Sequence, residues 1–173
     1  MFALSRDQTA QAVLPLDKNQ FADELAKQQI NQLYYSGQTG AGDELALSAQ
    51  SAVEGFDGQK MLEMKAVSAS IKGKNGLEIE VTAQFGQYLY SEKLLKMTGA
   101  VLISSSSGYK LSSPELRILT DGTYIFGEGP IEGLSPMGKI YAGKMEITRK
   151  NAKAPMQLWF GEKVVLDYEP SEI

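Results

Sequence analysis

One pattern limits the fold of this chain more than any other: apolar and polar residues alternate in short segments that end at turn residues. The clearest segment is LEIEVTA (77–83), in which every odd-numbered residue is apolar. Successive side chains of a β-strand point to opposite faces, so the segment predicts a strand with one buried and one wet face. Gly, Asn, Asp and Ser separate such segments at 37–42, 57–58, 75–76, 104–108 and 121–122. The spacing predicts an all-β sandwich, roll or barrel.

The predicted strands also repeat, with a period of about 30 residues. The segments VTAQFGQY (81–88), LSSPELRI (111–118) and IYAGKMEI (140–147) share one pattern, and a glycine-marked strand follows each of them. Two strands per unit predict stacked antiparallel strand pairs. Gly99 and Gly129 hold equivalent places in two units, and we expect them to mark a bend or a β-bulge.

The first 31 residues lie outside this pattern. A thin apolar stripe predicts either a helix over about 18–31 or a flexible linker. We therefore divide the chain into a leader or juxtamembrane linker (1–31), a β-domain (32–168) and a C-terminal tail (169–173). The sequence contains no run of about 18 apolar residues, so we expect no transmembrane helix in the chain as given.

The composition removes several kinds of chemistry. The 173 residues include no cysteine and no histidine, which excludes thiol catalysis, zinc–thiolate sites and imidazole acid–base catalysis. The net charge of −4 argues against nucleic acid as a partner, because binding phosphates requires clustered Lys and Arg. The absence of both cysteine and histidine favours a role other than catalysis, although carboxylate or Ser/Lys chemistry stays open, and we expect no cofactor and no metal.

The acidic residues offer only weak candidate sites. Glu78 and Glu80 share the wet face of one predicted strand, where paired carboxylates can do acid–base work. An exposed charged face explains them better. Asp43 and Glu44 carry oxygen ligands for calcium but lack the dense spacing of such a site, so we interpret them as turn residues.

A small basic loop contains Arg149, Lys150 and Lys153. Such a loop can bind phosphate or sugar acids. A solvated hairpin tip is the preferred interpretation, since isolated surface charges contribute little.

The apolar face of the sheet is the strongest candidate site. Ten residues can point to the same side: Leu77, Ile79, Val81, Leu95, Met97, Val101, Ile103, Tyr109, Leu111 and Ile118. For any one of them an ordinary core is the simpler explanation. Together they can also hold an acyl chain, because burial contributes about 0.8 kcal/mol per CH₂ group. Both interpretations remain open at this point.

The order of the segments resembles the periplasmic domain of LptC, a lipopolysaccharide export protein, and the related OstA-type domains. NQLYYSGQTGAGDELALSAQSAV (31–53) resembles the opening strand, glycine turn and second strand of that family. The central pattern A-x-x-G-x-Y, G-x-V-x-I and G-Y-x-L occurs within 83–111, and GEGPIEGLSPMGKIYAGKMEI (127–147) resembles the later strands. The resemblance covers about 32–168.

The resemblance implies an open β-jellyroll of repeated antiparallel strand pairs, with a short helical or flexible leader. It implies a non-enzymatic role, in which the domain receives lipopolysaccharide from an inner-membrane ABC transporter and passes it to a periplasmic bridge protein of the OstA type. The acyl chains would lie in the apolar interior. The family is anchored to the inner membrane by an N-terminal helix that this chain lacks. We therefore expect either a fragment of an anchored periplasmic protein, which is the preferred interpretation, or a free relative.

The resemblance also implies that the jellyroll joins its partners edge to edge. It places the transporter side near Tyr34, Tyr35 and Ser36. It places the bridge side within 158–168, at Trp159, Val164, Val165 and Leu166, where Val165 competes with its neighbours for the inward face. Two alternatives remain: a structural bridge, and a carbohydrate-binding β-domain without a lipid groove.

Overall fold

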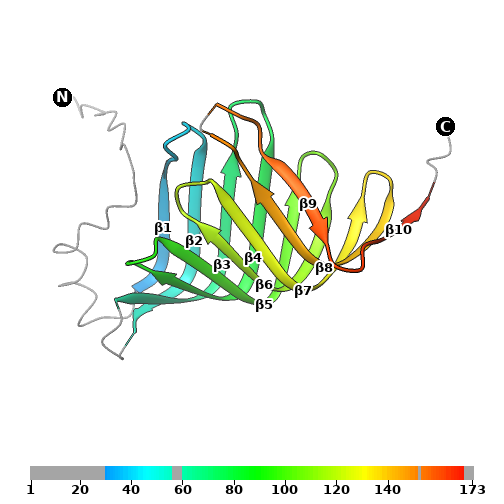
Figure 1. The fold of residues 1–173 in the computed structure, drawn as a ribbon. Helices are drawn as coiled ribbons and strands as arrows, with labels where there is room; N and C mark the ends of the chain where they lie inside the picture. Colours follow the sequence, from blue (N-terminus) through cyan, green and yellow to red (C-terminus); the bar gives the residue numbers. More distant parts are fainter. Residues whose placement is uncertain (1–29, 56–59, 152, 170–173) are drawn as a thin grey trace, which may run out of the picture.

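The computed structural model describes residues 30–55, 60–151 and 153–169. These residues form ten strands and no helix, as the alternation predicts (Figure 1). The helix expected over 18–31 falls almost entirely outside the described residues, and its last two residues belong to the first strand. The strands are β1 (Ile30–Gln38), β2 (Glu44–Glu54), β3 (Met61–Lys72), β4 (Glu78–Leu89), β5 (Leu94–Ser105), β6 (Lys110–Leu119), β7 (Tyr124–Ser135), β8 (Gly138–Thr148), β9 (Gln157–Gly161) and β10 (Val165–Tyr168).

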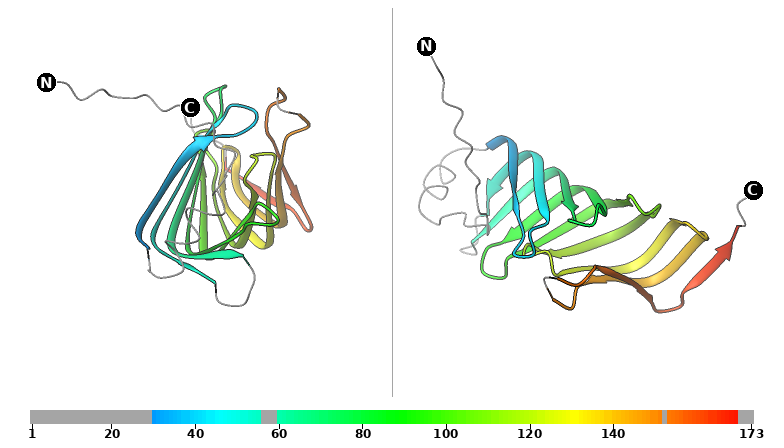
Figure 2. Two further views of the ribbon diagram at one scale, coloured as in Figure 1. Left: turned by 90° about the vertical axis from the view of Figure 1, so that its left-hand side faces the viewer. Right: turned by 90° about the horizontal axis from the view of Figure 1, so that it is seen from above.

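All ten strands belong to one antiparallel sheet, and from β1 to β8 each strand pairs with the next in the chain. The outer edge of β8 is shared, because β9 pairs with its second half and β10 with its first half. The sheet does not close on itself. Of the strands at its two free edges, β1 and β10 lie at opposite ends of the molecule (Figures 1 and 2).

The 30-residue repeat corresponds to successive hairpins, which confirms the predicted strand pairs. The three similar segments lie in β4, β6 and β8, and the glycine-marked strands lie in β5, β7 and β9/β10. The predicted turns at 75–76, 104–108 and 121–122 all fall at or beside the ends of strands that pair as hairpins.

Four successive strand pairs, from β4–β5 to β7–β8, bend at β-bulges, where the pairing register shifts. Gly99 (φ 77°) lies in the shift between Thr98 and Val101, and Gly129 (φ 102°) lies in the shift between β7 and β8. A Cβ on Gly129 would lie 2.6 Å from the Pro114 ring. The predicted bends at both glycines are therefore confirmed, and at Gly129 the close approach itself requires glycine.

The bulges keep the apolar face turned inward on both sides of the bend. In β4, β6 and β8 the buried positions step by three residues at the bulge, from 83 to 86, from 113 to 116 and from 142 to 145. Each bent strand therefore contributes to two layers, and Figure 2 (left) shows these layers with the interior between them. The core side chains Met97, Val101, Leu116 and Met145 have no exposed area.

A charge cluster stabilises the outer surface beside one bulge. The Glu115 carboxylate lies 3.1 Å from Lys96 Nζ and 2.8 Å from Arg117 Nε. Partial burial acts to raise the pKa of Glu115, but the hydrogen bonds from the two cations outweigh it and hold the pKa below its usual value.

Glu115→Gln is expected to lower the free energy of unfolding at pH 7 by about 0.5–1 kcal/mol. The effect is modest because the ion pairs of Glu115 with Lys96 and Arg117 are partly exposed to solvent. The pKa of Glu115 is lower in the folded state than the unfolded value of 4.5. The charged carboxylate therefore stabilises the fold above pH 4.5, and this stabilisation is lost as the pH falls through the lower pKa of the folded state. Urea unfolding at pH 7 and at pH 3 measures the difference. Glu132→Gln, an exposed carboxylate on β7, is the control, and an equal loss at both pH values would contradict the assignment.

Candidate functional site

The predicted apolar face lies in the interior of the folded sheet. All ten residues proposed for it belong to the hydrophobic core cluster or pack against it. Eight are buried, while Leu77 and Tyr109 are half-buried. The predicted inward direction is therefore confirmed for the set, and contact with lipid remains a prediction.

Side chains fill this interior almost completely. The space between the two layers is a cavity of about 20 Å³, which is room for roughly one water molecule. It is lined by residues from β1 to β7, including Ile79, Val81, Leu95 and Ile118 of the predicted set. In this state the interior is a packed core, and an acyl chain can enter only if side chains move or the layers separate.

Two tyrosines line this cavity through their rings, because the surface that faces the cavity is wholly apolar. The Tyr35 hydroxyl is buried and has no hydrogen-bond partner among the described residues, and burial raises its pKa. Tyr88 is 3% exposed, and burial likewise raises its pKa. Its ring packs edge-on against Tyr90, with centroids 5.1 Å apart. An unpaired buried hydroxyl is costly to the stability of the folded state.

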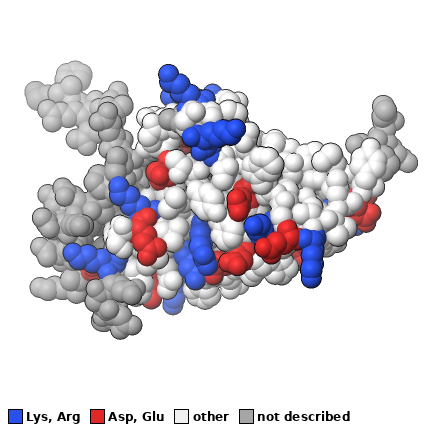
Figure 3. Space-filling model, viewed as in Figure 1, with Lys and Arg blue, Asp and Glu red and all other residues white. Residues whose placement is uncertain are grey.

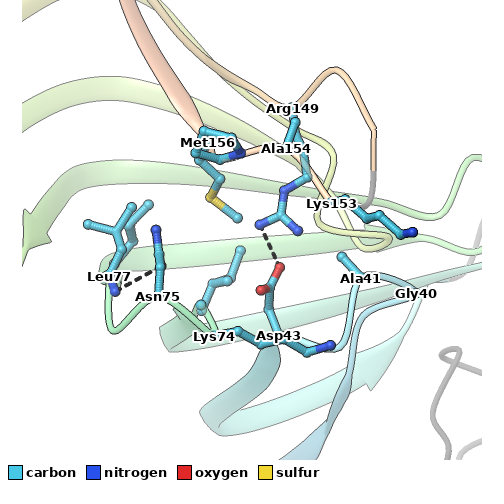
Figure 4. A pocket seen from close by; sticks show the side chains of 14 residues that line it. Gly40, Ala41, Asp43, Lys74, Asn75, Leu77, Arg149, Lys153, Ala154 and Met156 are labelled. Atoms are coloured by element: carbon cyan, nitrogen blue, oxygen red, sulfur yellow. Dashed lines mark hydrogen bonds and ion pairs between the residues drawn. The ribbon is translucent and has the colours of Figure 1, made fainter.

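A much larger pocket opens at the end of the molecule where the β1–β2 turn, the β3–β4 turn and the β8–β9 loop meet (Figure 4). Its volume is about 520 Å³. Ile71, Leu77, Ile79 and Met156 form its apolar part, and two of these residues also line the interior cavity. The pocket therefore borders the interior cavity, and the side chains of Ile71 and Ile79 lie at the boundary.

Five polar residues form another part of the wall of this pocket: Asp43, Lys74, Asn75, Arg149 and Lys153. They come from all three connecting segments, which the bending of the sheet brings together. Figure 3 shows Lys and Arg atoms gathered over the turns at the top of the view, which is this end of the molecule.

Arg149 is not part of a solvated hairpin tip, so that interpretation of the residue is wrong. Its Nη2 atom lies 2.6 Å from Asp43 Oδ2, and the two side chains are only 7% and 4% exposed. Thr39 also donates a hydrogen bond to the Asp43 carboxylate, at 3.4 Å. The folding of the sheet buries both charges in one ion pair, whereas Lys150 and Lys153 are exposed as expected.

Asp43 has a larger role than the turn residue that the sequence suggested. Its main-chain nitrogen donates to Thr39 Oγ1 at 3.2 Å, which fixes the turn, while its carboxylate joins that turn to the end of β8. Glu78 and Glu80 are exposed on the outer face, as predicted. Among the described residues, no group of three acidic side chains is placed to hold a metal ion.

The two free edges expose the residues predicted to meet partners, with one exception. Tyr34 (73% exposed) and Ser36 point outward from β1, while Tyr35 points inward. Trp159, Val164, Val165 and Leu166 are all exposed. Every residue of β10 is exposed, so neither its odd-numbered nor its even-numbered side chains face the core. The prediction that Val165 and its neighbours compete for an inward position is therefore wrong.

The fold and the site define a class: an open β-jellyroll with a largely apolar core and two unpaired edges. The sequence profile of the family described as lipopolysaccharide-assembly, LptC-related, matches residues 42–157. This chain belongs to that family, whose members are periplasmic components of lipopolysaccharide transport. A comparison with curated proteins found no match. No helix among the described residues is long and apolar enough to cross a membrane.

Proposed function

We propose that this domain binds the acyl chains of lipopolysaccharide in its apolar interior and passes the lipid on without catalysis. It would receive the lipid from the inner-membrane ABC transporter of the pathway and deliver it to a periplasmic bridge protein of the OstA type. The domain would work at the periplasmic side of the inner membrane. The observation that carries the proposal is that the 520 Å³ pocket borders the interior cavity, since Ile71 and Ile79 line both.

The size of the closed cavity sets a condition on this function. Because only about 20 Å³ is free between the layers, binding must displace core side chains or open the unpaired edges of the sheet. The burial of acyl chains supplies about 0.8 kcal/mol per CH₂ group toward that cost. The ten interior residues would then contact lipid as well as one another.

Photo-crosslinking tests the interior as the binding site. A photoreactive residue at Ile103 (4% exposed) or Val101 is expected to crosslink to lipopolysaccharide. The same residue at Leu102, which lies between them on β5 and is 56% exposed, or at Glu80 is expected not to crosslink. A thermal unfolding transition must show that each variant folds. Equal labelling at Ile103 and Leu102 would contradict binding in the interior.

A second candidate role, an edge-to-edge bridge, is favoured by the exposed apolar surface of the last strands. Trp159, Val165 and Tyr168 are each more than half exposed, and β10 has no partner on its outer side among the described residues. An unpaired strand edge readily accepts a strand from another chain. The two roles are compatible, because the family's transfer of lipid would pass through such a joint.

Val165→Asp is expected to weaken binding of the bridge protein by at least about tenfold, because it places a charge in an apolar strand-to-strand joint. The variant should keep the unfolding temperature of the original chain, since Val165 is 56% exposed. A pull-down or calorimetric titration with the bridge protein measures the effect. Leu102→Asp, a charge on an equally exposed residue far from this edge, is the control. Unchanged affinity of Val165→Asp would contradict the edge assignment.

A further inference from the structure

The polar half of the end pocket has no role in binding acyl chains. Its lining carries three cations, Lys74, Arg149 and Lys153, against one carboxylate, Asp43. The pocket therefore has a net charge of about +2 in a chain whose net charge is −4. Positive charge gathered in a concave site attracts anions more strongly than the same charges spread over a convex surface.

Arg149 is the residue that points to a ligand. Its side chain is only 7% exposed, and one nitrogen, Nη2, pairs with Asp43. The Nε atom is buried and has no hydrogen-bond partner among the described residues. A buried guanidinium N–H without an acceptor is costly, and buried polar groups nearly always have a partner. Figure 4 shows this side chain above the pocket, held in place by Asp43.

The surroundings of Arg149 define the chemistry of the missing acceptor. Guanidinium groups match the geometry of phosphate and carboxylate oxygens, and charge-assisted hydrogen bonds to them are the strong ones. Lys74 and Lys153 line the same pocket and are exposed, so they can turn toward an anion. Asp43 satisfies only part of the guanidinium, which fixes its orientation and leaves Nε available.

The apolar part of the pocket favours an anion that carries an apolar chain over a small free anion. Leu77, Ile79 and Met156 line the same space as the cations, and Ile79 also lines the interior cavity. We propose that this pocket binds the phosphate group of an anionic amphiphile through Arg149, Lys74 and Lys153, while its acyl chain extends toward the interior. This site rests on the proposed function, since it assumes that the interior accepts an acyl chain.

A matched set of small ligands tests the site on the full chain. Lysophosphatidic acid carries the phosphate and one acyl chain, the monoacylglycerol with the same chain lacks the phosphate, and glycerol 3-phosphate lacks the chain. Calorimetric titration below the micelle-forming concentrations measures all three. Lysophosphatidic acid is expected to bind at least about tenfold more tightly than either of the others, because the charge-assisted bonds and the acyl chain both contribute.

Two double variants separate the contributions of the cations. Lys74→Gln/Lys153→Gln removes exposed charge without touching the ion pair. Asp43→Asn/Arg149→Gln removes the guanidinium, leaves the net charge unchanged and leaves no buried charge unpaired. Each is expected to weaken lysophosphatidic acid binding by about tenfold and to leave monoacylglycerol binding unchanged. Lys72→Gln/Lys150→Gln, two exposed lysines outside the pocket lining, is the matched control and is expected to change neither.

The outcomes separate this site from the proposed function. Equal affinity for lysophosphatidic acid and the monoacylglycerol would overturn the phosphate site while leaving acyl-chain binding intact. Glycerol 3-phosphate binding as tightly as lysophosphatidic acid would show a site for small anions only and would overturn the amphiphile assignment. Failure of both acyl ligands to bind would overturn the proposed function. An unchanged affinity in Asp43→Asn/Arg149→Gln, with thermal unfolding confirming the fold, would remove Arg149 from the site.

Discussion

Arg149→Leu is expected to destabilise the domain by about 3–5 kcal/mol, because it leaves the Asp43 carboxylate buried without its counter-charge. Asp43 is 3% exposed, and its only ion pair among the described residues is the one with Arg149. The loss is a large share of the total stability of an ordinary domain, which is about 5–15 kcal/mol. Urea unfolding followed by circular dichroism measures it.

The loss of stability expected for Arg149→Leu arises because the Asp43–Arg149 ion pair is buried, and not because a cation is removed. Lys150→Leu, which removes the neighbouring exposed charge, is therefore expected to change the free energy of unfolding by less than about 0.5 kcal/mol. Asp43→Asn/Arg149→Leu should recover most of the loss, since no buried charge then remains unpaired. A cost of less than about 1 kcal/mol for Arg149→Leu would mean that the pair is solvated like a surface ion pair.

The strands, their turns and the inward face were predictable from the sequence because they depend on local order. The alternation in 77–83 determines which side chains share a face. The equivalent places of Gly99 and Gly129 in the repeat indicate where the bulges lie. What local order did not reveal is the three-residue step of the buried positions in β4, β6 and β8. A strict alternation would have turned the second half of each of these strands outward.

The ion pair could not be predicted in the same way. Asp43 lies in the β1–β2 turn and Arg149 follows β8, and six strands separate them in the sheet. Each residue taken alone belongs to a type that is usually exposed, which favoured a turn acid and a solvated tip. Only the bending of the whole sheet brings the two ends together and removes them from water.

The free volume of the interior could not be predicted from the sequence either. Ten apolar residues on one face are consistent with a lipid chamber and with a packed core, and the choice depends on the distance between two layers. The layers prove to be close, with a cavity of about 20 Å³. Lipid binding in this domain therefore requires a change of packing, so the energetics of the core bear directly on function.

Met97→Ala is expected to destabilise the domain by about 2–5 kcal/mol, because truncation of a fully buried side chain removes packing contacts and leaves a cavity. Met97 has no exposed area and lies on β5 just before the bulge at Gly99. Leu102→Ala on the same strand is the control, because Leu102 is 56% exposed and its truncation is expected to cost less than about 0.5 kcal/mol. Urea unfolding of the two variants gives the comparison, and equal losses would mean that the inward face of β5 is wrongly assigned.

The same variant tests whether the core and the lipid compete for one space. If acyl chains occupy the region of Met97, the cavity left by Met97→Ala lowers the cost of displacing side chains. Lysophosphatidic acid should then raise the unfolding temperature of Met97→Ala by more than that of the original chain, since a ligand that binds the folded state more tightly stabilises it more. An equal rise in both proteins would place the acyl chain elsewhere, outside the part of the core that Met97 fills.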